Sequence, residues 1–270
     1  MHESSESERT VEPSGLTNIR DLGGIIVDDG RHVAKGVLAR SEALGNATDE
    51  DLERITAMFD LKVIVDFRTE DEYAQQPDPL DRMPGARLIH APILNPASMG
   101  GSEDEGLDPE TIIRRFCGDS AEFMGRMYRD MMLQERGRTG YAAFFETLLQ
   151  TDEGAVLWHC TSGKDRTGIA SALLLHVLGA SAATIRNDYL AVNRLLDPHR
   201  EQVVRSCREM GLDERTIEVA VHASCAVEAT YLQAAFAAIE EGYDSVDGYL
   251  VNALRVTPDA QATLRERYLA

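Results

Sequence analysis

The decapeptide His159-Cys160-Thr161-Ser162-Gly163-Lys164-Asp165-Arg166-Thr167-Gly168 separates two apolar stretches of the chain. Before it, residues 154–158 (Gly-Ala-Val-Leu-Trp) form a short apolar run that is typical of a buried strand. After it, residues 169–178 are mostly apolar and predict a helix that ends at Gly179. The sequence therefore predicts a strand, a tight loop and a helix in succession, with Cys160 at the carboxyl end of the strand.

This arrangement favours an anion at the start of the helix. Backbone N–H groups and the positive end of the helix dipole point at one spot, where they stabilise negative charge. Gly163 lets the backbone approach closely, while Lys164 adds a compact positive charge. Arg166 adds a planar fork that matches two oxygens of a phosphate group. We therefore expect a doubly charged oxyanion to bind here.

Cys160 is the candidate nucleophile of this cradle. A helix amino terminus and nearby cations favour the thiolate form of a cysteine, which is its reactive form. Asp165 places a carboxyl group beside it. The alternative is a buried structural cysteine followed by a helix cap. The sequence disfavours it, because nothing structural requires a Lys-Asp-Arg run at this position.

The decapeptide resembles the signature loop of the cysteine-dependent protein tyrosine phosphatase superfamily, in which His-Cys is followed by five residues and Arg-Thr. The form with Gly163-Lys164-Asp165 is similar to the bacterial tyrosine/phosphoinositide phosphatases. The resemblance covers roughly residues 16 to 265, in the family's order. Besides the loop, four segments carry it: 18–24 (Asn-Ile-Arg-Asp-Leu-Gly-Gly), 40–44 (Arg-Ser-Glu-Ala-Leu), 65–68 (Val-Asp-Phe-Arg) and 243–250 (Tyr-Asp-Ser-Val-Asp-Gly-Tyr-Leu).

The resemblance implies an α/β fold: a central, mostly parallel sheet flanked by helices in three layers, with a helical lid and a helix-rich carboxyl-terminal part. We expect residues 1–14 to form a disordered tail, because they are polar and acidic, and residues 15–270 to form a single domain. Residues 94–135 are a candidate lid segment. Within them, the Met and aromatic residues of 110–135 have helical spacing and otherwise predict plain core.

The same resemblance implies a two-step reaction through a cysteinyl-phosphate intermediate. Asp165 is the expected general acid, because residues 93–96 (Ile-Leu-Asn-Pro) offer no aspartate where many tyrosine phosphatases carry one. His159 is expected to pack behind the loop and tune the thiolate, and Thr167 to donate a hydrogen bond to it. The residues expected to bind phosphate are Thr161, Ser162, Gly163, Lys164, Asp165 and Arg166.

Four charged residues outside the loop are candidates for supporting it. Arg20 and Asp21 are expected to form an ion pair or hydrogen-bond brace, which in a functional version holds the phosphate loop. Asp66 ends the predicted strand 62–66 and Arg68 follows it by two residues. Ligands of open α/β sheets bind beyond the carboxyl ends of strands. Asp66 and Arg68 therefore either line the cradle or form a structural network.

Several local patterns predict where other elements begin and end. Residues 25–27, 37–40 and 87–93 are expected to form strands. Thr48, Thr69, Ser181 and Asp213 each precede a helical pattern and are expected to cap the amino terminus of a helix.

Composition narrows the function classes. A net charge of −19 and a pI near 4.7 argue against general affinity for nucleic acid or anionic membranes. No stretch is long and apolar enough for a membrane-spanning helix, and the four cysteines form no metal-like cluster. We expect no metal and no cofactor. A nucleophilic thiol favours the cytoplasm, although export without a recognisable signal stays open.

The substrate is open at this level. Phosphotyrosine proteins and phosphoinositides both fit a wide cradle with a lysine, and the oligomeric state has no signature. Two other functions compete: a non-catalytic phosphate-binding protein, and a rhodanese-like sulfurtransferase, which also uses a strand, a cysteine loop and a helix. The first would be expected to lack Cys160 or Arg166, and the second usually has a shorter loop without the Arg166-Thr167-Gly168 ending.

Overall fold

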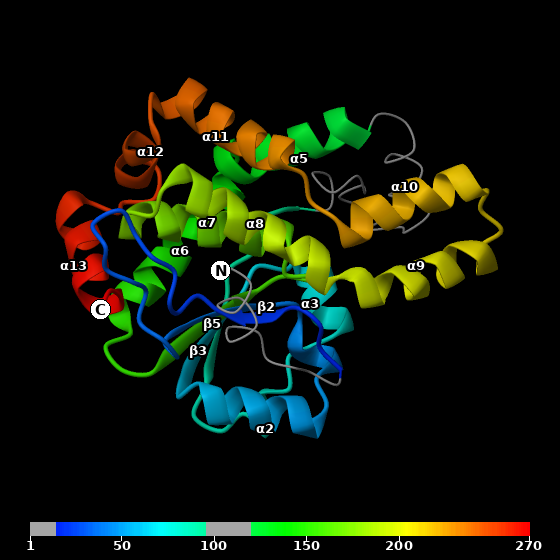
Figure 1. Cartoon of the computed structure of the whole chain (residues 1–270), viewed down its shortest axis with the longest axis horizontal. Helices are drawn as coiled ribbons and strands as arrows, with labels where there is room; N and C mark the ends of the chain where they lie inside the picture. The colour runs from blue at the N-terminus through cyan, green and yellow to red at the C-terminus, as the bar shows by residue number, and fades with distance from the viewer. Residues whose placement is uncertain (1–14, 96–119) are drawn as a thin grey trace.

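A five-stranded, mostly parallel sheet forms the centre of the protein (Figure 1). The computed structural model describes residues 15–95 and 120–270. The strand order is β1-β2-β5-β3-β4, and only β1 runs antiparallel to its neighbour. The strands are β1 (Ile19–Asp21), β2 (Leu38–Ser41), β3 (Leu61–Asp66), β4 (Arg87–His90) and β5 (Ala155–His159). The predicted α/β class with a mostly parallel sheet is confirmed.

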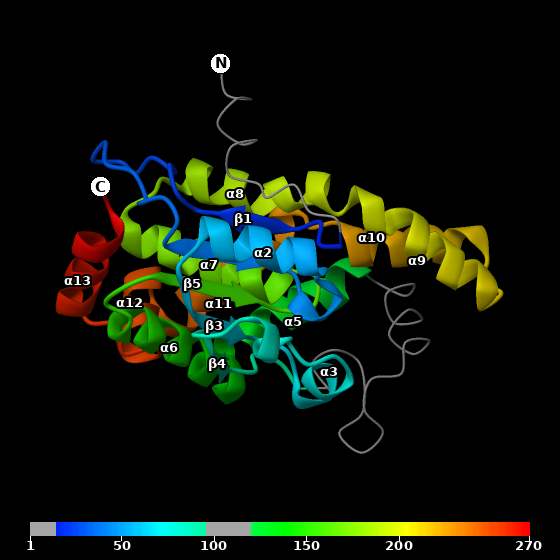
Figure 2. The same cartoon turned by 90° about the horizontal axis from the view of Figure 1, so that it is seen from below.

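Helices cover both faces of this sheet, which gives the three expected layers (Figures 1 and 2). Along β5, Val156 and Trp158 pack into the larger core, whereas Ala155 and Leu157 pack into the smaller one. This alternation follows from the strand's two-residue period. The described helices are α2 (Asp49–Met58), α3 (Glu70–Gln75), α5 (Ser120–Leu133), α6 (Glu135–Gln150), α7 (Asp165–Leu178), α8 (Ala182–Leu195), α9 (Asp197–Glu209), α10 (Glu214–Cys225), α11 (Ala229–Tyr243), α12 (Val246–Asn252) and α13 (Pro258–Tyr268), with short 3-10 turns η1 (Leu44–Asn46) and η2 (Leu80–Arg82).

The two layers of helices differ in size. Helix α2 covers the smaller core, and helices α5, α6, α7, α8 and α11 contribute to the larger one. The hairpin α9–α10 extends away from the sheet (Figure 1) and has a small core of its own around Cys207 and Ile217. In the described part of the chain, no helix has both the length and the apolar composition that crossing a membrane requires.

The predicted helix caps are confirmed. The side chains of Thr48, Thr69, Ser181 and Asp213 each accept a hydrogen bond from a backbone N–H in the first turn of α2, α3, α8 and α10. Gly179 ends α7 in the left-handed conformation with φ of 90°. These ends are predictable because a cap is a local interaction between residues two or three positions apart.

Three of the expected elements differ from the structure by more than one residue. Helix α7 begins at Asp165 rather than at residue 169, because its polar first turn belongs to the loop that the apolar pattern excludes. Residues 25–27 form no strand; Ile26 makes only an isolated bridge to His32. Strand β4 ends at His90 rather than at residue 93. The expected tail 1–14 and most of the expected lid, residues 96–119, lie outside the described residues, and the end of that lid segment contributes to helix α5.

Candidate active site

Cys160 lies where the sheet meets the start of α7. It directly follows β5 and is 2% exposed. Lys164 occupies the position before α7, and no side chain caps this helix, unlike α8 and α10. The first N–H groups of a helix have no partner within the helix. An anion at the loop is therefore the natural partner for this end of α7.

Contacts from the antiparallel edge of the sheet hold the loop in shape. Gly163 has a φ of 67°, and a Cβ there would lie 2.3 Å from the carbonyl oxygen of Ser41. Asn18 Nδ2 donates to the carbonyl oxygen of Ser162 at 2.8 Å, and Arg40 Nη2 donates to that of Gly163 at 2.9 Å. The loop thus fits against β1 and β2 only because residue 163 has no side chain.

The brace continues through a buried charge cluster. Arg40 Nη1 lies 2.7 Å from Asp188 Oδ2, and Arg20 Nη1 lies 3.5 Å from Asp188 Oδ1. Arg20 therefore reaches the loop through Asp188 and Arg40. Asp21 has a separate place, because it accepts from the backbone N–H groups of two glycines, Gly23 and Gly36, both at 2.8 Å. Arg20 and Asp21, the two residues expected to support the loop, therefore contact different parts of the molecule.

Arg166 is held by a carboxylate from the other side of the loop. Its Nη1 lies 2.6 Å from Glu72 Oε2, and its Nη2 lies 2.8 Å from Glu72 Oε1. Thr161 Oγ1 also donates to Glu72. Although burial opposes the charge, Arg166 lowers the pKa of Glu72 to about 2. The pKa of Arg166 is raised, because Glu72 outweighs its burial. Glu72 thus fixes the guanidinium inside the site.

Asp165 has a different donor on each carboxylate oxygen. Lys164 Nζ lies 2.8 Å from Oδ2, and the hydroxyl of Tyr128 donates to Oδ1 at 2.6 Å. The hydroxyl of Tyr141 donates to the carbonyl oxygen of Arg166 at 3.2 Å. The loop's own Lys164 and two tyrosines from α5 and α6 therefore meet on the first turn of α7.

His159 lies behind the loop in a buried network of charges. Its Nδ1 lies 3.0 Å from the carbonyl oxygen of Cys160, and its Nε2 lies 3.1 Å from Asp78 Oδ2. Both ring nitrogens face acceptors, which suits the imidazolium form. Burial opposes that charge, but Asp78 and Asp66 raise the pKa of His159.

Asp66 and Arg68 belong to the same network. Arg68 donates to both carboxylate oxygens of Asp66, and its Nη2 lies 3.1 Å from Asp78 Oδ2. All three side chains are at most 1% exposed. Oxygen and nitrogen atoms of Asp66, Asp78 and His159 lie close enough together to surround a metal ion. However, Arg68 already supplies a cation to both carboxylates, so the arrangement is that of a structural ion network.

Comparison with known proteins identifies the family. The sequence pattern of the tyrosine phosphatase family matches residues 11–270. The chain belongs to this family. It is therefore a phosphatase, an enzyme that hydrolyses phosphoric monoesters.

The similarity to individual relatives also extends over most of the chain. A protein of Cupriavidus necator, named as a candidate tyrosine-protein phosphatase, is 34% identical over 259 residues, which cover 94% of this chain and 86% of that protein. The triple specificity protein phosphatase PtpB of Mycobacterium tuberculosis is 27% identical over 265 residues, 90% of this chain and 93% of its own. A tyrosine-protein phosphatase of Nostoc commune is 32% identical over 185 residues, 63% of this chain and 56% of its own.

The hydroxyl of Thr167 has a distinctive environment in this phosphatase. Its Oγ1 is buried and has no hydrogen-bond partner among the described residues, and Thr167 itself is 0% exposed. An unpaired buried hydroxyl is costly unless a further group uses it. This environment is compatible with the expected hydrogen bond to the Cys160 thiolate, although the described contacts contain no such bond.

Several residues that contact the loop are absent from the predicted site residues: Asn18, Arg40, Glu72, Asp78, Tyr128 and Tyr141. Glu72 had a local signal, because Thr69 and Glu72 form a capping box in which each side chain accepts from the other residue's backbone N–H. That pattern marks the start of a helix and does not reveal that the same carboxylate meets Arg166. Tyr128 belongs to the Met and aromatic stripe that predicted core.

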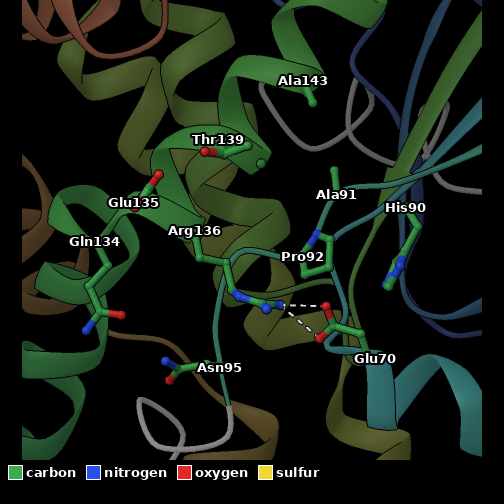
Figure 3. Close-up of a pocket in the computed structure, with 11 residues that line it drawn as sticks. Glu70, His90, Ala91, Pro92, Asn95, Gln134, Glu135, Arg136, Thr139 and Ala143 are labelled. Atoms are coloured by element: carbon green, nitrogen blue, oxygen red, sulfur yellow. Dashed lines mark hydrogen bonds and ion pairs between the residues drawn. The ribbon is translucent and has the colours of Figure 1, made fainter.

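A separate cleft of about 700 Å³ lies beside the site (Figure 3). It lies between the end of β4 and the starts of α3 and α6, where Arg136 Nη1 donates to both carboxylate oxygens of Glu70 at 2.8 Å. No residue of the 159–168 loop lines it. The cleft therefore neighbours the loop through α3, which carries both Glu70 and Glu72, but does not contain Cys160.

Proposed function

We propose that this phosphatase hydrolyses phosphomonoesters in two steps, with Cys160 as the nucleophile. One observation carries the proposal: Cys160 begins the short loop that leads from β5 into α7, whose amino terminus has no side-chain cap, and this loop and the first turn of α7 carry Lys164 and Arg166. Positive charge and backbone N–H groups at one point stabilise both a thiolate and the oxygens of a phosphoryl group.

In the first step, the thiolate of Cys160 attacks phosphorus, so that an S–P bond forms and the P–O bond to the leaving group breaks. Arg166 and the loop N–H groups hold the equatorial oxygens. Asp165 transfers its carboxyl proton to the leaving oxygen, which departs as an alcohol or phenol. Glu72 supports this step by orienting the guanidinium, because it accepts from Nη1 and Nη2 of Arg166. Since no described residue accepts from Nε, that nitrogen is left for a phosphate oxygen.

In the second step, water attacks the cysteinyl phosphate. A new P–O bond forms, the S–P bond breaks, and the thiolate of Cys160 is restored. The Asp165 carboxylate accepts the proton that water loses, which returns the acid to its starting form. In this proposal Thr167 donates a hydrogen bond to the departing thiolate, and its buried hydroxyl, which has no partner among the described residues, supports that role.

The substrate class that we propose is phosphotyrosine in proteins. The family supports it, as do the names of two of the relatives, which contain the words tyrosine-protein phosphatase. Phosphoinositides are a second candidate, because the buried Lys164 gives the loop a cation in addition to Arg166. A thiolate nucleophile suits a reducing compartment, so we place the protein in the cytoplasm.

Two variants and a substrate panel test the proposal. Cys160→Ser is expected to abolish release of phosphate from an aryl phosphate, because serine cannot replace a thiolate at neutral pH. Cys207→Ser changes a buried thiol outside the loop and is the matched control. Turnover by Cys160→Ser near the control's rate would refute the covalent mechanism. Phosphotyrosine peptides and soluble phosphoinositides, assayed for released phosphate, then rank the two substrate classes.

The same assays separate the rival functions. A non-catalytic binding protein would bind inorganic phosphate in calorimetry but release none from any substrate in the panel. A rhodanese-like enzyme would instead transfer sulfur from thiosulfate to cyanide. Cys160-dependent thiocyanate formation without phosphate release would favour that alternative.

A further inference from the structure

The carboxyl group of Asp165 is held by two unlike donors, one on each oxygen. The charged Lys164 Nζ lies 2.8 Å from Oδ2, within the loop itself. The neutral hydroxyl of Tyr128, which comes from α5, donates to Oδ1 at 2.6 Å. The two oxygens therefore differ chemically. Oδ2 is paired with Lys164, a cation that a phosphate would also attract, whereas Oδ1 is bound to a neutral hydroxyl.

The hydroxyl of Tyr128 is a fixed donor. Tyr128 is 0% exposed, and burial, followed by the charge of Asp165, raises its pKa well above the usual value. It therefore keeps its proton across the working range of an enzyme. Its ring packs at 5.7 Å between centroids against Tyr231 and edge-on against Tyr189 at 6.5 Å. With its ring held on two sides, its hydroxyl has little freedom to leave Asp165.

Tyr189 completes the chain from the far side. The two tyrosine hydroxyl oxygens lie 2.6 Å apart. Because Tyr128 donates to Asp165, the hydroxyl of Tyr189 is the donor in this second bond. Tyr189 approaches α7 at Gly168, where a Cβ would lie 3.0 Å from its ring. The hydrogen bonds therefore run in one direction, from Tyr189 to Tyr128 and on to Asp165.

We propose that Tyr128, supported by Tyr189, is a positioning residue that fixes Oδ1 of Asp165 and thereby directs Oδ2 to the leaving oxygen. This inference rests on the proposed function, in which Asp165 is the general acid. A bound phosphoryl group attracts Lys164 away from Oδ2, and Oδ2 then carries the proton that Asp165 took from water in the preceding turnover. Transfer breaks the Oδ2–H bond and forms the O–H bond of the leaving alcohol. The carboxylate that remains keeps the hydrogen bond from Tyr128.

A series of aryl phosphates with increasingly basic leaving groups tests this role. For Tyr128→Phe we expect kcat/KM to fall on the order of tenfold with poor leaving groups, which is part of the ~10²–10⁴ that a general acid supplies. With activated leaving groups, which need no proton, kcat/KM should be nearly unchanged. The inhibition constant of inorganic phosphate should also stay the same, because the Arg166 contacts are intact. A merely structural role would lower all rates alike.

Tyr231→Phe is the matched control. Its ring packs against Tyr128, but its hydroxyl donates to Glu228 Oε1 at 3.5 Å and not to Asp165. It should leave the dependence on the leaving group unchanged. If Tyr128→Phe fails to fold, as circular dichroism would reveal, Tyr189→Phe is measured in its place and should steepen the dependence in the same direction. An unchanged dependence in the folded variant would overturn the inference.

A double-mutant cycle separates this inference from the proposed function beneath it. If Tyr128 acts through Asp165, Tyr128→Phe should have no further effect in the Asp165→Asn background. Independent, additive losses would refute the positioning role while leaving Asp165 as the acid. If Asp165→Asn alone leaves the rate with poor leaving groups unchanged, the acid assignment itself is wrong, and the inference falls with it.

Discussion

Glu72 and Arg166 form a two-point ion pair inside the phosphate loop, with nitrogen–oxygen distances of 2.6 and 2.8 Å. The side chain of Glu72 is 14% exposed and that of Arg166 is 6% exposed, so water screens the pair only weakly. Because Glu72 also accepts from the backbone N–H of Thr69, it ties the guanidinium to the start of α3. The guanidinium is thus oriented by the protein before any phosphate binds.

Glu72→Gln should therefore weaken both the fold and the activity. Removing one partner of a buried ion pair costs about 3 kcal/mol of unfolding free energy. A misplaced guanidinium should lower kcat/KM on the order of 10²-fold. Urea unfolding and steady-state kinetics with an aryl phosphate at pH 7 measure the two effects. The control is Glu70→Gln on the same helix, whose exposed pair with Arg136 should be worth less than ~1 kcal/mol. Equal effects of the two variants would contradict this prediction.

The same ion pair should make stability depend on acid. The pKa of Glu72 is about 2 in the folded protein and 4.5 as the reference value. Because the pKa of Glu72 is lower in the folded protein, its carboxylate stabilises the fold. This contribution to the free energy of unfolding is complete above pH 4.5 and is lost as the pH falls toward 2. Its full size is about 3 kcal/mol. The difference in unfolding free energy between wild type and Glu72→Gln should therefore narrow between pH 7 and pH 3. A constant difference would argue against the lowered pKa.

How much of this site could be predicted depends on the distance along the chain between its parts. Cys160, Lys164, Asp165 and Arg166 stand within seven residues, so their chemistry and the helix that follows were readable from sequence. Glu72 meets Arg166 across a separation of 94 residues, and Tyr128 meets Asp165 across 37. No periodicity encodes such contacts, which arise only when the sheet brings the elements together.

The hydrophobic pattern of the sequence is also ambiguous for side chains that have both an apolar body and a polar end. Tyr128 was predicted as core, and its ring is indeed buried, yet its hydroxyl lies on Asp165. Asp66 and Arg68 lie at the carboxyl end of β3 as expected, but the charge of Arg68 is balanced by Asp66 and Asp78. Hydrophobic spacing reports where a residue sits and does not report the partner of its polar atoms.

The pair of His159 and Asp78 predicts a titration behind the loop. The pKa of His159 is raised above 6.5, so its imidazolium form should persist beyond the pH at which an exposed histidine loses its proton. The stability from this charge is complete below pH 6.5 and is lost as the pH rises through the folded pKa. Asp78→Asn removes the negative charge beside His159 and should lower the pKa of His159.

Histidine ring resonances, followed by NMR across pH, measure that shift directly. Asp81→Asn is the matched control, because Asp81 is an exposed residue of the adjacent 3-10 turn η2. It should leave the titration of His159 unchanged. If His159 titrates at the same pH in wild type and Asp78→Asn, then the carboxylate does not set its charge.

Gly163 offers the strictest test of the loop's shape. Alanine there would take a φ of 67°, and its Cβ would lie 2.3 Å from Ser41 O and 2.7 Å from Asn18 Nδ2. Gly30→Ala has a comparable φ of 89° with no atom within 4 Å, so it incurs the backbone strain of about 1 kcal/mol without the collision. Only Gly163→Ala should move the loop, lowering kcat/KM on the order of 10²-fold. Kinetics normalised to the folded fraction compare the two variants, and equal activity would mean that the loop tolerates displacement from β2.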